Sequence, residues 1–210
     1  MSSYTIGIDV GGTKTAYGLF DSISLVLASS SPRRIQMLRE HGINPLVIPT
    51  NIDEAIPSHL DVKEAVMHLA LKKAMKAKED ARVPSGAWIV GADTVVYKDR
   101  IIGKPAGVEE AVNILKYLRG AAHDVYTGVA LIRPADCLRR VFYERTRVFF
   151  KDYSDEEITA YISSGEPFDK AGGYAIQGGF AKYIDKIEGD RNNVIGFPWD
   201  RFVEELLRTI

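Results

Sequence analysis

A carboxylate lies in the middle of an otherwise apolar stretch of this sequence. Asp93 stands within Trp-Ile-Val-Gly-Ala-Asp-Thr-Val-Val-Tyr. A charge in such a run carries a large desolvation cost unless it is paired, hydrogen-bonded or bound to a metal. The alternative, that Asp93 ends a strand and caps a turn, is disfavoured because Val95, Val96 and Tyr97 continue the apolar run. We therefore interpret Asp93 as a functional carboxylate.

Two lysines could serve the same site. A helix expected over residues 60–79 has an apolar stripe whose next step is Lys73, which places this lysine on the buried face. The alternative is a side chain that runs along the helix end into solvent. Lys104, in Gly-Lys-Pro, follows the strand of Asp93 after an expected turn, and by itself it is typical of an ordinary loop lysine.

Residues 29–34 combine groups that suit an anion. Ser31 is a good N-cap and Pro32 fits the first position of a helix, so a helix begins here. Arg33 and Arg34 fall in its first turn, where cations oppose the helix dipole, and an anionic partner would resolve that conflict. Arginine also suits bidentate contact with phosphate. A capped helix with solvated arginines remains the alternative.

A glycine-rich segment supplies further polar groups. Residues 169–179 read Asp-Lys-Ala-Gly-Gly-Tyr-Ala-Ile-Gln-Gly-Gly and include Lys170 and Gln177. Glycine permits close approach of a backbone to a ligand, although a plain turn would have the same composition. The carboxylate, the lysines and the helix start together indicate a polyphosphate with a divalent metal, because Mg²⁺ typically binds through one or two carboxylates plus phosphates.

Composition restricts the class of protein. A chain of 210 residues suits one domain, and this domain could consist of two lobes. Its formal net charge of -1 gives no general attraction to nucleic acid or to an anionic membrane, so we expect neither as a partner. The single cysteine, Cys137, excludes an internal disulfide and favours a reducing compartment. The N-terminus lacks the pattern of a signal peptide, and we expect a cytoplasmic protein.

Strands and helices alternate along the chain, which predicts an α/β fold, with a mixed sheet and flanking helices. Strands are expected at residues 23–28, 46–48, 88–97, 123–132 and 141–151, the last two paired. Helices are expected at residues 32–41, 60–79, 108–119, 155–165 and 198–207. The segment 172–187 predicts short strands joined by tight turns.

The first residues do not fit this domain. Residues 4–21 contain Asp-Val-Gly-Gly-Thr-Lys between two apolar-alternating stretches, a pattern that could form a β-hairpin. The string resembles the first phosphate motif of sugar kinases of the actin and hexokinase superfamily. The resemblance ends near Asp21, and nothing later supplies the second phosphate motif or the adenosine motif of such a kinase. We expect residues 1–22 to be an appended leader or fusion remnant without activity, and residues 23–210 to be the functional domain.

The remainder resembles the Maf family of nucleotide pyrophosphatases over residues 24 to about 209. The motifs that carry the resemblance occur in order along the chain. They are Ala-Ser-Ser-Ser-Pro-Arg-Arg at 28–34, Leu-Ala at 69–70 followed by Lys-Ala at 73–74, Gly-Ala-Asp-Thr at 91–94, Gly-Lys-Pro at 103–105, Asp-Lys-Ala-Gly at 169–172, Ile-Gln-Gly at 176–178 and Val-Ile-Gly-Phe-Pro at 194–198.

The resemblance implies a cleft between two lobes, as in Maf and ITPase proteins, a homodimer, and hydrolysis of a nucleoside triphosphate to the monophosphate and pyrophosphate. It makes Asp93 the proton acceptor and assigns Glu54, with Asp93, to a divalent metal cation, Mg²⁺ or Mn²⁺. Lys104 would act with Asp93 in catalysis and hold phosphate. The residues that would bind the substrate are Ser29, Arg33, Arg34, Lys73, Thr94, Lys170 and Gln177.

Arg33, Thr94 and Gln177 match the family positions that set nucleobase choice. The Ala-Asp-Thr and Ile-Gln-Gly variants resemble the branch that acts on dTTP and UTP, with modified pyrimidine nucleotides as further candidates. Gly-Tyr-Ala at 173–175 departs from the more frequent Ala-Tyr-Gly, which bears on the base preference. The alternative function is a nucleotide-binding regulator of cell division or septum formation without significant catalysis.

Overall fold

The computed structural model describes residues 23–209, so the expectations for residues 1–22 lie outside the described part of the chain. Within it, the strands form one seven-stranded mixed sheet in the order β2-β1-β3-β5-β6-β7, with β4 paired to β3. The strands are β1 Leu25–Leu27, β2 Leu46–Val47, β3 Trp88–Lys98, β4 Arg100–Ile102, β5 Ala122–Arg133, β6 Leu138–Phe150 and β7 Ile184–Glu188. Neighbours β2, β1 and β3 are parallel, and the other pairs are antiparallel.

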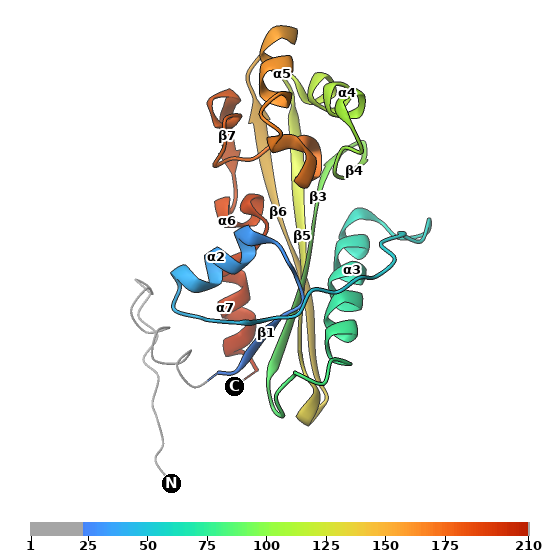
Figure 1. Cartoon of the computed structure of the whole chain (residues 1–210), viewed down its shortest axis with the longest axis vertical. Coiled ribbons are helices and arrows are strands. Elements are labelled where there is room, and N and C mark those ends of the chain that lie inside the picture. The colour runs from blue at the N-terminus through green and yellow to red at the C-terminus, as the bar shows by residue number, and fades with distance from the viewer. Residues whose placement is uncertain (1–22, 210) are drawn as a thin grey trace.

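Helices cover both faces of this sheet. They are α2 Pro32–Glu40, α3 Val62–Ala77, α4 Val108–Leu118, α5 Asp155–Ile162, α6 Arg191–Ile195 and α7 Trp199–Leu207. Figure 1 shows α2 and α7 on one side of the long strands and α3 on the other, with α4 and α5 at the far end. The long strands β3, β5 and β6 run from the end that α2, α3 and α7 cover to the end that α4 and α5 cover, and these two ends are the two lobes. The expected α/β fold with a mixed sheet is confirmed.

Side chains of β3 alternate between the two helical layers, as the pleat of a strand requires. Trp88, Val90 and Ala92 pack in the core that faces α2 and α7. Ile89 belongs to the core that faces α3. Asp93 therefore points to the α3 side of the sheet, and its neighbour Thr94 points to the α2 side.

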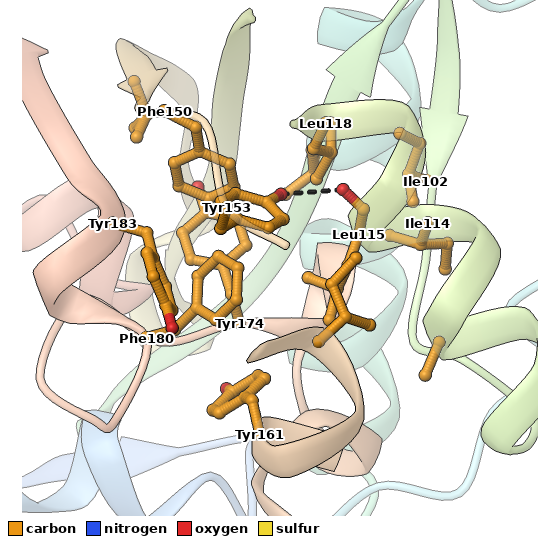
Figure 2. Packing of buried hydrophobic residues seen from close by; sticks show 14 of the residues in the cluster. Ile102, Ile114, Leu115, Leu118, Phe150, Tyr153, Tyr161, Tyr174, Phe180 and Tyr183 are labelled. Atoms are coloured by element: carbon orange, nitrogen blue, oxygen red, sulfur yellow. Dashed lines mark hydrogen bonds between the residues drawn. The ribbon is translucent and has the colours of Figure 1, made fainter. Parts of the chain in front are cut away.

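A third core fills the lobe that contains α4 and α5. Figure 2 shows Phe150, Tyr153, Tyr174 and Phe180 packed together beside α4 and α5. Phe150 and Tyr174 have ring centroids 4.7 Å apart at 78°, an edge-to-face arrangement that aromatic pairs prefer. The Tyr153 hydroxyl donates to the Leu115 carbonyl of α4 at 2.7 Å, so its polar tip is satisfied inside the apolar cluster.

Most of the expected starts and ends of helices and strands are confirmed. Ser31 is the N-cap of α2, although its side chain makes no capping hydrogen bond. Ser154 opens α5 with a capping box in which its hydroxyl accepts from the Glu157 amide. The turn after β3 falls at Asp99, which has a positive φ of 60°. The paired strands expected at 123–132 and 141–151 form the β5–β6 hairpin.

The expectation for residues 172–187 is wrong over most of its length. This segment contains 3₁₀ turns at Ala171–Gly173 and Ala181–Tyr183, and only β7 is a strand. Gly172 and Gly173 have φ of 71° and 69°, values that interrupt extended backbone and that glycine adopts without strain. Periodicity gave no sign of the short helix α6, whose N-cap Asp190 accepts from the Asn192 amide.

No helix among residues 23–209 is both long and apolar enough to cross a bilayer.

Candidate active site

One cavity of about 600 Å³ opens beside the middle of β3. Parallel pairing of β1 with β3 stops at Val90, and β4 joins β3 only from Val96 onward. Between these points, residues 91–95 have no described strand beside them on that edge, and the cavity lies over this gap. It is lined by every residue that the sequence nominated: Ser29, Arg33, Arg34, Glu54, Lys73, Asp93, Thr94, Lys104, Lys170 and Gln177.

The wall of the cavity is cationic although the whole chain is not. Five lysines and arginines line it against three carboxylates, whereas the chain carries a formal net charge of -1. Clefts lined by an excess of one charge concentrate ligands of the opposite sign. The cavity therefore favours a polyanion of nucleotide size, because ligand pockets of about 300–1,000 Å³ accommodate molecules of that size.

Lys73 joins the two carboxylates nominated for metal binding. Its ammonium lies 2.6 Å from Asp93 Oδ1 and 2.7 Å from Glu54 Oε1. The side chains of Lys73 and Asp93 are only 12% and 11% exposed, so the expectation of a lysine on the buried helix face is confirmed and the solvent-directed alternative is wrong. Lys72, the preceding residue, donates to the Asp53 carbonyl at 2.5 Å and so holds the Glu54 segment against α3.

Two glycines let α3 approach the sheet closely enough for Lys73 to reach Asp93. A Cβ built on Gly91 would lie 2.1 Å from the Ala70 carbonyl oxygen of α3. A Cβ on Gly128, which is the cross-strand partner of Asp93, would lie 2.3 Å from the Val66 carbonyl. Only residues without a Cβ can occupy these two positions with α3 where it is.

Glu54 is held ionised by its neighbours. Partial burial, the largest single influence, pushes the pKa of its carboxyl upward. The hydrogen bond and charge of Lys73, together with the charges of Lys104 and Arg34, outweigh burial, so the pKa lies below its ordinary value. The side chain is 57% exposed and lines the cavity.

Arg34 is the centre of a polar cluster on the α2 side of β3. Its guanidinium donates to the Gly196 carbonyl at 2.8 Å, to Ser29 Oγ at 3.1 Å and to Thr94 Oγ1 at 2.9 Å. Burial lowers the pKa of Arg34 to about 10, although the charges of Asp93 and Glu54 oppose this shift. Three of its five N–H groups are thus directed at protein oxygens, and Arg34 organises the wall of the cavity.

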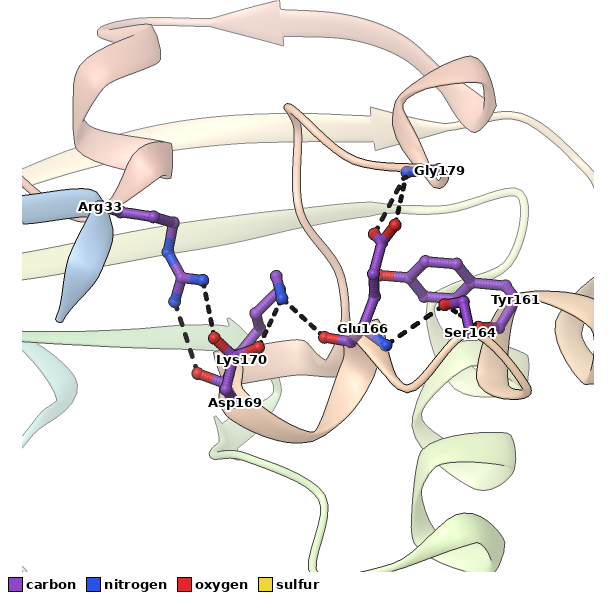
Figure 3. A network of polar contacts seen from close by, with 7 residues as sticks. All are labelled: Arg33, Tyr161, Ser164, Glu166, Asp169, Lys170 and Gly179. Carbon is purple, nitrogen blue, oxygen red and sulfur yellow. Dashed lines mark hydrogen bonds and ion pairs between the residues drawn. The ribbon is translucent and has the colours of Figure 1, made fainter. Parts of the chain in front are cut away.

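Arg33 and Lys170, which both line the cavity, belong to a separate network of polar contacts, shown in Figure 3. Arg33 Nη1 lies 3.0 Å from Asp169 Oδ2, which ties α2 to the 3₁₀ turn Glu166–Asp169 of the other lobe. Lys170 contacts the Asp169 carboxylate and donates to the Glu166 carbonyl at 2.7 Å. Lys104 and Gln177 are exposed residues on the cavity wall.

Several buried polar residues behind the cavity were not identified from the sequence. Thr127 is fully buried on β5 directly opposite Thr94, and their hydroxyl oxygens lie 2.9 Å apart. His123 Nε2 lies 2.6 Å from the Tyr174 hydroxyl, which fixes the glycine-rich segment to β5. The available signal was a polar residue inside an apolar strand, the same signal that identified Asp93, but only the strand register shows which groups they meet.

The arrangement is suited to hydrolysis of a phosphoric anhydride. A partly buried carboxylate within a cationic cavity can accept a proton from a water molecule. Lysines beside it can stabilise negative charge on phosphate oxygens. The carboxylates of Glu54 and Asp93 both contact the Lys73 ammonium. Two carboxylates together with substrate phosphates are the ligands that Mg²⁺ typically takes.

Comparison with known proteins gives a consistent result. Residues 24–209 match the family model described as Maf-like protein. The chain is 46% identical over 185 residues to a dTTP/UTP pyrophosphatase of Geobacillus sp. (strain WCH70), covering 88% of this chain and 97% of that protein. Proteins with the same name from Caldicellulosiruptor bescii and Staphylothermus marinus are 47% and 49% identical, covering 83% of this chain and 88% and 83% of those proteins.

Proposed function

The chain belongs to the family of Maf-like proteins, and we propose that it is a pyrophosphatase that hydrolyses dTTP and UTP to the monophosphate and pyrophosphate. The structural observation that carries the proposal is the contact of Lys73 with both Asp93 and Glu54 inside a cationic cavity. Such an enzyme would remove nucleotides, modified pyrimidine nucleotides included, from the pool that supplies nucleic acid synthesis.

Lysines bind the polyphosphate in this proposal. Lys73 reaches the cavity from α3, and Lys104 reaches it from the segment after β4. Both are point charges with three donors, which suits oxygens of a flexible triphosphate chain. Their role is to place the α-phosphorus near Asp93 and to stabilise charge that develops on the departing pyrophosphate.

Glu54 and Asp93 would hold a divalent cation, Mg²⁺ or Mn²⁺, together with the phosphates of the substrate. Bound there, the cation would act as a Lewis acid towards a phosphate oxygen and a water molecule. The fit is supported by the two carboxylates, which both contact the Lys73 ammonium. It is also supported by the pKa of Glu54, which burial raises but which the charges of Lys73, Lys104 and Arg34 together bring below its ordinary value.

Asp93 is the proposed general base. Its carboxylate lies on the α3 side of the sheet, fixed by Lys73 at 2.6 Å, and it is only 8% exposed. It accepts the proton of the water that attacks the α-phosphorus, the bond from this phosphorus to the bridging oxygen breaks, and pyrophosphate leaves. General base catalysis typically contributes about 10²- to 10⁴-fold to the rate.

Replacement of this base tests the proposal. Pyrophosphate release is measured with Mg²⁺ over a panel of NTPs and dNTPs for the wild type, for Asp93→Asn and for the control Asp124→Asn. Asp124 lies on β5 outside the cavity, and this control removes its ion pair with Arg145 of β6. We expect Asp93→Asn to lose at least about 10²-fold in kcat while its thermal unfolding stays cooperative. Normal turnover by this variant would refute the assignment. Tight nucleotide binding by a wild type that releases no pyrophosphate would instead favour the regulator.

The proposal also covers the oligomeric state and the cellular compartment of the enzyme. On the family resemblance, the chain forms a homodimer, which light scattering of the full chain tests directly. The free and exposed thiol of Cys137 supports a reducing compartment such as the cytoplasm.

A further inference from the structure

The segment that carries Glu54 has no side chain in the core. Residues 49–57 form neither a helix nor a strand, and none of them is buried. Thr50, Glu54 and Ile56 of this segment line the cavity. A segment with few buried apolar contacts opens readily unless other contacts hold it. The position of Glu54 therefore depends on polar contacts.

Those polar contacts go to two consecutive lysines of α3. Within the described part of the chain, each hydrogen bond or ion pair that joins residues 49–56 to another element ends on Lys72 or Lys73. Lys73 Nζ lies 2.7 Å from Glu54 Oε1 and so holds the end of that side chain. Lys72 Nζ donates to the Asp53 carbonyl at 2.5 Å and so holds the backbone next to Glu54.

A local turn transmits the second contact to Glu54. Asp53 Oδ1 accepts from the Ala55 amide at 2.9 Å, so the residues on both sides of Glu54 are fixed relative to each other. Because Lys72 holds the Asp53 carbonyl against α3, the turn keeps its place beside this helix. Glu54, in the middle of the turn, is thereby held at the cavity that it lines.

Lys72 and Lys73 differ in what competes for them. Lys73 lines the cavity and also contacts Asp93 at 2.6 Å, and in the proposed function it binds phosphate. Its one charge is then shared among Glu54, Asp93 and the substrate. Lys72 does not line the cavity, and its acceptor is a neutral carbonyl. Phosphate that draws Lys73 away from Glu54 therefore leaves the contact of Lys72 with the backbone intact.

A carboxylate that binds a metal needs support of this kind. The Glu54 side chain is 57% exposed, so little surrounds it once Lys73 has turned to phosphate. Contacts that orient a metal ligand typically contribute about 10–100-fold to metal affinity. Among residues 23–209, the contact of Lys72 with Asp53 is the one tether of this segment to another element that phosphate does not claim.

We propose that Lys72 is a positioning residue that keeps Glu54 in place for a divalent cation while Lys73 binds phosphate. This inference rests on the proposed function, in which Glu54 is a ligand of that cation. Lys72 touches neither the substrate nor the cation and acts through the Asp53 carbonyl.

The sign of a change in metal affinity separates positioning from charge. Lys72→Met removes the ammonium and keeps an unbranched side chain of similar length. Loss of a nearby positive charge would by itself strengthen the binding of a cation, because like charges repel. Loss of positioning would weaken it. The two effects of one substitution therefore have opposite directions.

Binding of Mn²⁺, followed by electron paramagnetic resonance of the free ion, measures this affinity without turnover. The protein is titrated in the presence of saturating α,β-methylene-UTP, in which a methylene group replaces the oxygen between the first two phosphorus atoms and prevents hydrolysis there. We expect the Kd of Mn²⁺ to rise by about tenfold or more in Lys72→Met. Lys72→Arg, which keeps an N–H donor of similar reach, should remain close to the wild type.

The dependence of UTP turnover on Mg²⁺ is a second readout. A residue that positions a metal ligand affects the reaction most where the metal is scarce. We expect the Mg²⁺ concentration that gives half-maximal activity to rise by about tenfold in Lys72→Met. The fall in activity should be larger at low than at saturating Mg²⁺, whereas damage to the fold would lower activity equally at every concentration.

Lys76→Met is the matched control. Lys76 lies one turn further along α3, forms an ion pair with Glu79 and does not line the cavity. This variant loses the same charge from the same helix and should leave the Kd of Mn²⁺ close to that of the wild type. Thermal unfolding of each variant is recorded, and if Lys72→Met does not fold, Lys72→Gln takes its place in both measurements.

The outcomes separate this inference from the function on which it rests. An unchanged or lower Kd of Mn²⁺ in folded Lys72→Met, an equal rise in Lys76→Met or in Lys72→Arg, or wild-type turnover of UTP without a divalent cation would each overturn the inference while pyrophosphatase activity stands. A wild type that hydrolyses no nucleoside triphosphate would refute the proposed function, and the inference with it.

Discussion

The close contact between α3 and the sheet makes Gly91→Ala an informative substitution. The new methyl group would lie 2.1 Å from the Ala70 carbonyl oxygen and 2.8 Å from the Ala74 amide nitrogen. Both atoms are backbone, so no side-chain rotation relieves the contact. Real Cβ atoms keep at least 3.0 Å from such neighbours, and α3 must therefore move away from β3.

The required displacement is about 1 Å, the difference between the permitted and the built distances. Lys73 lies on α3 between the two obstructing residues, and its ammonium contacts Asp93 at 2.6 Å. A misplacement of about 1 Å can cost about 10²-fold in rate, and we expect kcat/KM for UTP to fall by that factor. Overpacking of this kind also costs about 1–3 kcal/mol in the free energy of unfolding.

Pyrophosphate release and urea denaturation of the same preparations test both effects. Gly107→Ala is the control, because a Cβ at Gly107 meets nothing within 4 Å and its φ of -174° is extended backbone. Because Gly107 is the N-cap of α4, where alanine caps less well than glycine, this control should cost up to about 1 kcal/mol in the free energy of unfolding. It should leave kcat/KM close to the wild type. Full activity in folded Gly91→Ala would show that the approach of α3 does not control the position of the lysine, and the reasoning from packing to catalysis would fail.

Three further substitutions test other contacts of the site. Burial raises the pKa of Glu54, but Lys73, Lys104 and Arg34 together lower it below its ordinary value of 4.5. The stabilising effect of the Glu54 carboxylate is therefore complete above pH 4.5 and disappears as pH falls through the folded pKa. The Tm difference between wild type and Glu54→Gln should shrink below pH 4.5, and a difference that widens there would contradict this sign. Arg34→Lys cannot serve the three oxygens that the guanidinium reaches, and we expect a loss of about 2 kcal/mol in urea denaturation, whereas an unchanged midpoint would show that these bonds contribute little. Tyr174→Phe leaves the His123 ring without this hydrogen bond and should cost about 1–3 kcal/mol; because burial, aided by the charge of a nearby lysine, lowers the pKa of His123 to about 3, this cost should be the same in urea denaturation at pH 6 and pH 8.

Local patterns in the sequence were sufficient to predict the elements that carry the proposed general base, Asp93. The apolar run around Asp93 predicted a buried strand, and the structure places it within β3. The helical period predicted that Lys73 faces inward, and it does. These predictions succeed because burial within one element depends on a period that neighbouring residues define.

Contacts between distant segments could not be predicted in the same way. Arg33 and Asp169 are 136 residues apart, and nothing near either residue indicates the other. The meeting of Thr94 with Thr127 depends on the register of β3 and β5, which is a property of the sheet. The glycine-rich segment misled the prediction because a run of glycines does not reveal which of them take positive φ.

The unbroken strands β3, β5 and β6 have a consequence for how such a protein can change. Two separate domains joined by a linker can hinge, be exchanged for other domains or be expressed apart. Here the 11, 12 and 13 residues of these strands belong to both lobes at once. Neither lobe would therefore keep its strands complete if the chain were cut between them.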